Sequence, residues 1–218
     1  MDQPTQPRPT PLAHYLAQRR SEREHIRPPR RDQLRQLAGL LQTARASDDV
    51  ARAVFVCTHN ARRSHFAMVW FNIAVQQAGL TGHYAYSGGT EATAVNPRAI
   101  AALRRAGLLV EALTPHDANC VYLVRTQPDA PPVVCFSKPF TSPPNPAGGF
   151  VAVMVCHDAD NACPAVPDAA ARMALPYEDP RVADNTPDEQ HAYDQSCSQI
   201  AREMLFLADQ LRADPPQC

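Results

Sequence analysis

Residues 54–64 read VFVCTHNARRS, an apolar run that ends at a cysteine and is followed six positions later by an arginine. Residues 53–56 are short, β-branched and bounded by polar residues, which predicts a buried strand. From Ser64 the chain reads SHFAMVWFNIAVQQAG, long enough for a buried helix that ends at Gly79. Such a strand-to-helix turn points successive backbone N–H groups at the positive end of the helix and forms a site for a tetrahedral oxyanion.

Cys57 lies at the floor of this predicted turn. N–H donors, Arg63 and the neighbouring Arg62 should let its thiol ionise well below the free-thiol pKa of about 8.5, which makes it a nucleophile at neutral pH. Asn60 tolerates a left-handed conformation, and the hydroxyl of Ser64 can donate to a thiolate. The spacing alone arises easily by chance among 7 cysteines, and the alternative is a buried packing residue. The predicted strand before it and helix after it favour the functional interpretation.

Length and composition predict one sizeable core with an extension. The chain has 218 residues, of which 44% are hydrophobic. We expect a helical extension over residues 1–50, packed on the core, and an enzyme domain over residues 51–218. A net charge of -1 does not indicate the basic surface that nucleic-acid binding requires. Any anion must therefore be bound by positive groups gathered at one local site.

The sequence also indicates a compartment. No apolar run reaches signal-peptide length near the N-terminus, and no window reaches the roughly 18 apolar residues of a membrane span, so we expect a cytoplasmic protein that does not bind membranes. Seven cysteines is an odd number in a chain too large to need disulfide staples. Reduced, catalytic or redox-active thiols are therefore the better interpretation.

The first 50 residues predict two helices. Residues 31–46 repeat leucine at helical spacing, which predicts an amphipathic helix, and a shorter helix is expected over residues 12–20. Covering the core or a sheet edge is favoured over binding a partner. Residues 27–30, Arg-Pro-Pro-Arg, are interpreted as a linker.

The next segments predict a parallel sheet. Residues 84–90, YAYSGGT, are typical of a strand that runs into a Gly-rich turn. A helix should follow from Pro97 to residue 106, with Asn96 as its N-cap and Gly107 at its end. Strand, helix, strand and helix in alternation predict an α/β fold with an open, mostly parallel, twisted sheet flanked by helices. Ligands bind at the carboxyl ends of such strands, where Cys57 lies.

A Pro-rich insertion then precedes a central strand. Strand-like runs at residues 120–124 and 133–136 lie among prolines, so residues 126–150 predict a hairpin or an irregular loop. The apolar run of residues 150–155 is typical of a central parallel strand. It ends at Cys156, a second cysteine at a strand's carboxyl end that could reach the pocket of Cys57.

The C-terminal part contains a cysteine-rich motif and a long helix. Residues 156–164 read CHDADNACP, and a short linker leads to residues 175–180, LPYEDP. Residues 186–189, TPDE, predict a helix start with an N-cap, a proline at the first position and a capping box. The helix should bury one apolar face, made of Tyr193, Ile200, Met204, Leu207 and Leu211.

The same motif offers no convincing metal site. Asp158 and Asp160 are spaced as in a calcium loop, but Ala162 stands at the next ligand position and the glycine is missing. Zinc would have only His157 at hand locally. We expect no metal.

Four motifs in order resemble the low-molecular-weight protein tyrosine phosphatase superfamily, and within it the thioredoxin-coupled arsenate reductases. They are VCTHNARRS, YSGGTEATAVNPRA, CHDADNACP and EDP, and the resemblance runs from about residue 54 to residue 211. The resemblance implies Cys57 as nucleophile, Arg63 as anion clamp and Asp179 as general acid, with Cys156 and Cys163 as a redox relay. It also implies a substrate-binding loop, with Asn60 and Ser64 shaping it and stabilising the thiolate, made of Thr58, His59, Asn60, Ala61, Arg62, Arg63 and Ser64.

The chemistry of oxygen displacement requires the same residue types. Displacing an oxygen from arsenate or a phosphate ester needs a thiolate, positive charge on the equatorial oxygens and an acid for the leaving group. Asp179 is the natural acid, the alternative being a turn residue before Pro180, and a facing dianion should raise its pKa.

Two further cysteines suit a reductase, which must pass on two electrons and then return to the thiol state. Thioredoxin would reduce the resulting disulfide, so no other cofactor is expected. If residues 156–163 were helical, Cys156 and Cys163 would lie roughly 10 Å apart, beyond the reach of a disulfide. The segment must then move during turnover.

Departures from the family bear on the substrate. His59 stands where many relatives have glycine, and Arg62 replaces a small residue or cysteine. The extension and the Pro-rich insertion have no counterpart in small members. Arg181 and Val182 stand in place of an aromatic pair, which favours a small inorganic oxyanion over phosphotyrosine.

Three functions remain open. Arsenate reduction with side phosphatase activity is favoured. The alternative is a protein or small-molecule phosphatase whose nucleophile is protected by a reversible disulfide. A non-catalytic oxyanion- or arsenite-binding redox sensor is disfavoured because a binder needs no general acid such as Asp179.

Overall fold

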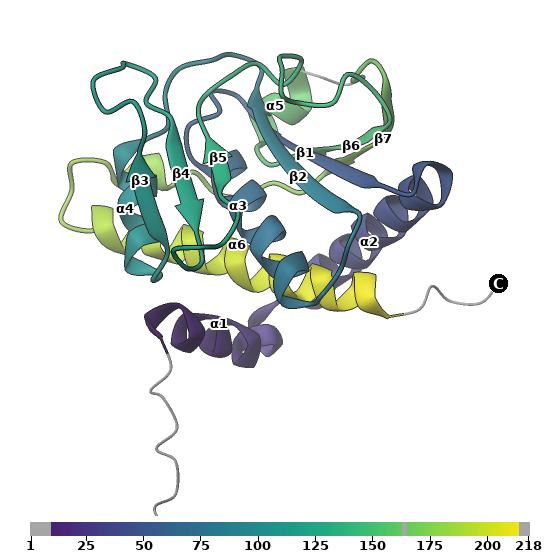
Figure 1. Cartoon of the computed structure of the whole chain (residues 1–218), viewed down its shortest axis with the longest axis horizontal. Coiled ribbons are helices and arrows are strands. Elements are labelled where there is room, and N and C mark those ends of the chain that lie inside the picture. Colours follow the sequence, from purple (N-terminus) through teal and green to yellow (C-terminus); the bar gives the residue numbers. More distant parts are fainter. Residues whose placement is uncertain (1–9, 163–164, 214–218) are drawn as a thin grey trace, which may run out of the picture.

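A four-stranded parallel sheet in the order β2-β1-β6-β7 forms the centre of the protein (Figure 1). The structure is a computed structural model that describes residues 10–162 and 165–213. The sheet is flanked by helices, which confirms the predicted α/β class. Its strands are β1 (Ala51–Cys57), β2 (His83–Gly89), β6 (Phe150–Met154) and β7 (Ala169–Ala174).

Burial explains why β1 and β6 are the central strands. Every residue of β6 is buried, as are all residues of β1 except Arg52. Continuous apolar runs of this kind suit strands covered on both faces. Strand β7 was missed: its sequence, AAARMA, has neither β-branched residues nor alternation, and a linker was expected there.

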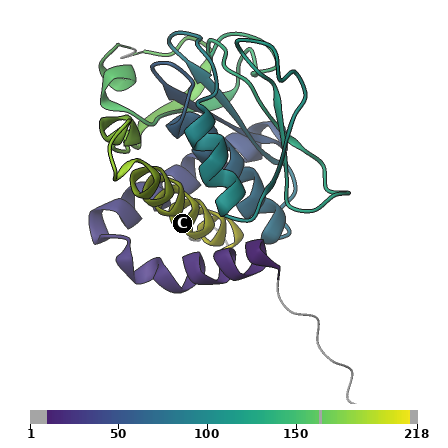
Figure 2. The ribbon, with the colours of Figure 1, turned by 90° about the vertical axis from the view of Figure 1, so that its left-hand side faces the viewer.

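The helices and short 3-10 turns follow the chain in a regular order. They are α1 (Pro11–Ser21), η1 (Glu22–His25), α2 (Pro28–Asp48), α3 (Arg63–Gln77), α4 (Pro97–Arg105), α5 (His157–Ala162), η2 (Pro180–Ala183) and α6 (Glu189–Arg212). Helix α6 packs against α1, α2, α3 and α4, and α2 also contacts β1. Figure 2 shows the N-terminal helices curving around α6. No helix in residues 10–162 and 165–213 has the length and apolar character needed to cross a membrane.

The Pro-rich insertion forms part of a second, antiparallel sheet. Strands β4 (Tyr122–Arg125) and β5 (Val133–Cys135) pair as the predicted hairpin. Strand β3 (Leu109–Ala112), which was not predicted, joins β4 on its other side. The sheet order is β3-β4-β5. The insertion is therefore an ordered structure beside the main sheet.

Residues 27–30 are not the linker that was expected. Helix α2 begins at Pro28, because proline is tolerated in the first turn, where its missing N–H costs no hydrogen bond. Arg30 Nε donates to Glu203 Oε2 at 2.8 Å, and the two side chains are only 14% and 3% exposed. The same guanidinium donates to the carbonyl oxygens of Leu175 and Pro176. The first turn of α2 therefore anchors α6 and the segment before Asp179.

The start of α6 also differs from the prediction. The helix begins at Glu189 rather than at Pro187, and Asp188 precedes it without a side-chain cap. The Glu189 carboxylate accepts the N–H of Asn185 and pairs with Arg98, so it is used outside the capping box. The predicted apolar face of α6 is confirmed, since all five of its residues are buried.

Arg30→Ala is expected to lower the free energy of unfolding by about 3–5 kcal/mol, because it leaves the buried carboxylate of Glu203 uncompensated. Urea denaturation measures the difference. Arg35→Ala is the matched control: its pair with Asp32 is exposed on the same helix and should contribute less than about 1 kcal/mol. Equal effects of the two substitutions would contradict the anchoring role.

Candidate active site

The loop after β1 has the conformation that the sequence predicted. Asn60 has a φ of 44°, in the left-handed region. Its Nδ2 donates to Ser64 Oγ at 2.9 Å, and Ser64 Oγ lies 3.1 Å from Cys57 Sγ. Since Asn60 already donates to the Ser64 oxygen, the hydroxyl hydrogen of Ser64 can be given to the sulfur of Cys57.

The carbonyl groups of the loop point away from the Cys57 thiol. Those of Cys57, Thr58 and Ala61 accept backbone N–H groups from residues 90–96. The backbone N–H groups of the loop are therefore free to face the opposite side, as in an anion-binding turn. Helix α3 begins at Arg63, so its N-terminus also faces this point.

Gly88 and Gly89 continue β2 instead of forming the turn that was expected. A Cβ on Gly89 would lie 2.6 Å from Thr58 O and 2.8 Å from Asn60 N, and one on Gly88 would lie 2.3 Å from the Cα of Phe140. Gly89 is needed for close packing against the loop, and Gly88 for close packing against Phe140. Sequence patterns do not distinguish such packing from turn formation.

Two residues that support the loop were not found from the sequence. His65, fully buried, has its Nε2 2.9 Å from Asn60 O, and burial, followed by the charge of Lys138, lowers its pKa to about 3. The backbone N–H of Lys138 donates to Asn60 Oδ1 at 2.9 Å. The imidazole is thus neutral and positions the loop. Neither contact could be predicted from a local sequence pattern. Lys138 is distant from Asn60 in sequence, and His65 lies within an otherwise apolar helix.

Arg62, Arg63 and Asp179 form one ionic cluster. Arg62 Nε donates to Asp179 Oδ1 at 2.9 Å, and Arg63 Nη2 donates to Asp179 Oδ2 at 2.6 Å. Arg63 Nη1 donates to the carbonyl oxygen of Tyr177 at 3.0 Å. The loop arginines and the carboxyl group therefore meet although they are far apart in sequence.

The charge around Asp179 differs from the expectation. Burial would raise its pKa, but the hydrogen bond from Arg62 and the charges of Arg63 and Arg62 outweigh burial and lower the pKa below its ordinary value of 3.8. The sequence-based expectation of a raised pKa considered only a facing dianion. In the structure the nearest charges are guanidinium groups.

Cys156 lies beside the loop because β6 pairs with β1. The parallel register sets Val56 opposite Met154, which brings the ends of the two strands together. Thr58 Oγ1 lies 3.6 Å from Cys156 Sγ, and the sulfur accepts the N–H of Ala159 at 3.3 Å. Cys163 lies outside the described residues.

The predicted residues that the structure describes gather in one place. A small pocket is lined by Cys57, His59, Ala61, Arg62, Arg63 and Asp179. His59 is half exposed at its edge, with Nε2 3.9 Å from Glu91 Oε2. Within residues 10–162 and 165–213, no group of His, Cys, Asp and Glu side chains is arranged to hold a metal ion.

Residues 52–122 match the family model described as "Low molecular weight phosphotyrosine protein phosphatase". The predicted family resemblance is confirmed. The low-molecular-weight phosphatase match covers the nucleophile loop and β2, and it stops before Cys156 and Asp179. The positions of these two residues beside the loop come from the structure and not from the family match.

Relatives include both phosphatases and arsenate reductases. Arsenate reductase 2 of Staphylococcus haemolyticus (strain JCSC1435) is 28% identical over 127 residues, which cover 58% of this chain and 76% of the relative. A low-molecular-weight protein tyrosine phosphatase from Bacillus subtilis has a TM-score of 0.48 at 18% identity, covering 75% of this chain and 98% of its own. An arsenate reductase in the phosphate-binding state has a TM-score of 0.46 at 18% identity, covering 74% and 99%.

Taken together, the comparisons show that this chain is similar to enzymes of the low-molecular-weight phosphatase family, among them phosphatases and an arsenate reductase.

Asp179→Asn is expected to lower the free energy of unfolding at neutral pH by about 1–2 kcal/mol, because partly buried hydrogen bonds from two arginines lose their charge. The folded-state pKa of Asp179 is depressed. Its contribution is therefore complete above the ordinary pKa and is lost as pH falls through the lowered folded-state pKa. Urea unfolding of both proteins across this acidic range measures the difference.

Asp32→Asn is the control for this experiment, because the Asp32 carboxylate is 73% exposed in its pair with Arg35. It should change stability by less than about 1 kcal/mol. A difference between wild type and Asp179→Asn that stays constant into strong acid would contradict the ion-pair assignment.

Proposed function

We propose that this protein reduces arsenate to arsenite through a thiol relay and is regenerated by thioredoxin, with phosphatase activity as a side reaction. The observation that carries the proposal is the position of Cys156, whose Sγ lies 3.6 Å from the hydroxyl of Thr58, next to Cys57. A hydrolytic phosphatase needs one cysteine, whereas a reductase needs a second thiol at this place. The similarity to an arsenate reductase supports the same choice.

In the first step the Cys57 thiolate attacks arsenic, and an arsenate oxygen leaves as water after protonation. Arg62, Arg63, the N–H groups of residues 58–64 and the N-terminus of α3 would stabilise the charge on the remaining oxygens. Asp179 would supply the proton to the leaving oxygen. The oxyanion competes with Asp179 for both arginines, so its binding frees the carboxyl group and raises its pKa toward that of a working acid.

The next steps transfer two electrons to arsenic. Cys156 attacks the sulfur of Cys57, the sulfur–arsenic bond breaks with its electron pair going to arsenic, and arsenite leaves. Cys163 then attacks Cys156, which frees Cys57 and leaves a Cys156–Cys163 disulfide for thioredoxin to reduce. Helix α5 has only 6 residues and lies between the two cysteines, so it would unwind during this exchange.

A reducing, cytoplasmic compartment is part of the proposal. Cys57, Cys120, Cys135, Cys156 and Cys197 are free thiols among the described residues. A reductase of this kind must find its catalytic cysteines reduced at the start of each cycle.

The second candidate is a phosphatase in which a disulfide protects Cys57 from over-oxidation. The family model, which describes phosphotyrosine phosphatases and covers the nucleophile loop, favours it. Both functions share the first step and differ in what resolves the Cys57 adduct, which is a thiol in the reductase and water in the phosphatase.

Three serine substitutions test the relay. Cys57→Ser should abolish both arsenate reduction and hydrolysis of para-nitrophenyl phosphate, because a hydroxyl is not ionised at neutral pH. Cys156→Ser should stop arsenite production and leave phosphatase activity intact. Cys163→Ser should release about one arsenite per enzyme and stop as a Cys57–Cys156 disulfide, detectable by mass spectrometry.

Cys120→Ser provides the control, since Cys120 lies in the region of the second sheet and should be dispensable. NADPH consumption with thioredoxin, thioredoxin reductase and arsenate follows the reductase reaction. Undiminished thioredoxin-dependent turnover by Cys156→Ser or Cys163→Ser would refute the relay and favour the phosphatase.

Asp179→Asn should slow formation of the Cys57 adduct by about 10²–10⁴-fold, the usual contribution of a general acid. Oxyanion binding should instead become several-fold tighter, because Arg62 and Arg63 no longer pair with a carboxylate. Single-turnover kinetics and calorimetric titration with inorganic phosphate measure the two effects. Weaker phosphate binding with an unchanged single-turnover rate would make Asp179 a structural residue.

A further inference from the structure

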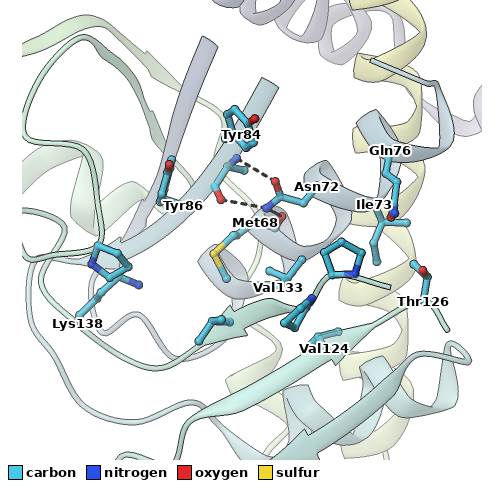
Figure 3. Close-up of a pocket in the computed structure, with 15 residues that line it drawn as sticks. Met68, Asn72, Ile73, Gln76, Tyr84, Tyr86, Val124, Thr126, Val133 and Lys138 are labelled. Carbon is cyan, nitrogen blue, oxygen red and sulfur yellow. Dashed lines mark hydrogen bonds between the residues drawn. The ribbon is translucent and has the colours of Figure 1, made fainter. Parts of the chain in front are cut away.

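A second and larger cavity lies away from the candidate active site. It has a volume of about 400 Å³ and lies between α3 and β2 on one side and β4 and β5 on the other (Figure 3). This volume is within the range of small-molecule sites. Its residues differ from those of the pocket around Cys57.

The walls of the cavity are mostly apolar. Met68 and Ile73 come from α3, Val124 from β4 and Val133 from β5. Asn72 also lines the cavity, but its side chain is already satisfied, since it donates to the carbonyl oxygens of Met68 and Ala85 and accepts the N–H of Ala85 (dashed lines in Figure 3). It therefore contributes no free polar group to a ligand.

Lys138 lies at one end of this cavity, opposite Thr126 and Gln76 in Figure 3. It is the only lysine in the sequence, which otherwise uses arginine for its basic residues. Its side chain is buried, with 5% of the residue exposed. A long cationic side chain normally keeps its charge in water, so burial at the end of an apolar cavity requires an explanation.

The ammonium group of Lys138 has no acidic partner in the part of the chain that the structure describes. It lies 4.4 Å from the centroid of the Phe136 ring. Within residues 10–162 and 165–213 no carboxylate or carbonyl oxygen accepts a hydrogen bond from it, and none of the residues that line the cavity is acidic. Its Nζ is not among the side-chain atoms sealed from solvent, so the group remains accessible to a small molecule. Burial lowers the pKa of Lys138 to about 8, so the group is still mostly protonated at neutral pH.

We propose that this cavity binds a small apolar monocarboxylate, with the carboxylate at Lys138 and the hydrocarbon part along the walls formed by α3, β4 and β5. One ammonium group at the end of the cavity matches one negative charge, and a charge-assisted hydrogen bond would satisfy it. A phosphate or another dianion would need more donors than this cavity supplies. Apolar walls of this extent favour a medium-length aliphatic or aromatic acid over acetate.

Decanoate is a suitable probe, and calorimetric titration of the full chain measures its binding. Lys138→Met should weaken decanoate binding at least about tenfold, because the side chain keeps its length and loses its charge. Lys138→Arg should keep affinity within a few-fold, because the positive charge remains. Decan-1-ol, which has the same chain and no charge, should bind wild type and Lys138→Met equally.

Chemical labelling tests the same site in the unaltered protein. Because Lys138 is the only lysine, acetic anhydride has just two kinds of amine to modify, Lys138 and the α-amino group. Decanoate should slow acetylation of Lys138 and leave the α-amino group unaffected, as measured by mass spectrometry of tryptic peptides.

Equal decanoate affinity in wild type and Lys138→Met, no measurable binding to wild type, or no protection of Lys138 from acetylation would each overturn the inference. None of these measurements uses arsenate, phosphate esters or thioredoxin. The inference can therefore fail while the proposed function holds, and the reverse is also true.

Discussion

The parallel pairing of β1 with a neighbour on each side is the constraint on which the rest of the structure depends. Pairing with β2 sets Cys57 opposite Gly89, and pairing with β6 brings Cys156 to the same edge of the sheet. Strands β1 and β6, which have a neighbour on each side, are buried on both faces, as their apolar sequences allow. The loop after β1, Gly89 against which it packs, and Cys156 therefore share one edge of the sheet without needing to be near in sequence.

The strongest sequence signals were those with local causes. Apolar runs predicted β1 and β6, and Asn96 and Gly107 marked the limits of α4. Alanine-rich β7 was missed because its residues carry no strand preference, and its pairing with β6 alone makes it a strand. The first turn of α2 was mistaken for a linker because proline is common in both settings.

The candidate site divides in the same way. The left-handed conformation of Asn60 and its contact with Ser64 follow from a few consecutive residues. The ion pairs of Asp179 with Arg62 and Arg63 join segments that are distant in sequence, so no rule based on residue spacing predicts them. They also reverse the direction expected for the pKa of Asp179. In the proposed mechanism Asp179 is held by the arginines that would bind the oxyanion, so occupancy by an oxyanion and protonation of the carboxyl group would be linked and change together.

Arg30 connects the N-terminal helix α2 to the segment that carries Asp179. Its guanidinium holds the carbonyl oxygens of Leu175 and Pro176, and it lies 4.5 Å from the ring of Tyr177, whose own carbonyl oxygen accepts from Arg63. Residues in α2 and in the segment before Asp179 are therefore expected to covary among homologous sequences. A comparison of sequences confined to residues 52–122 would leave out residues that determine the position of Asp179.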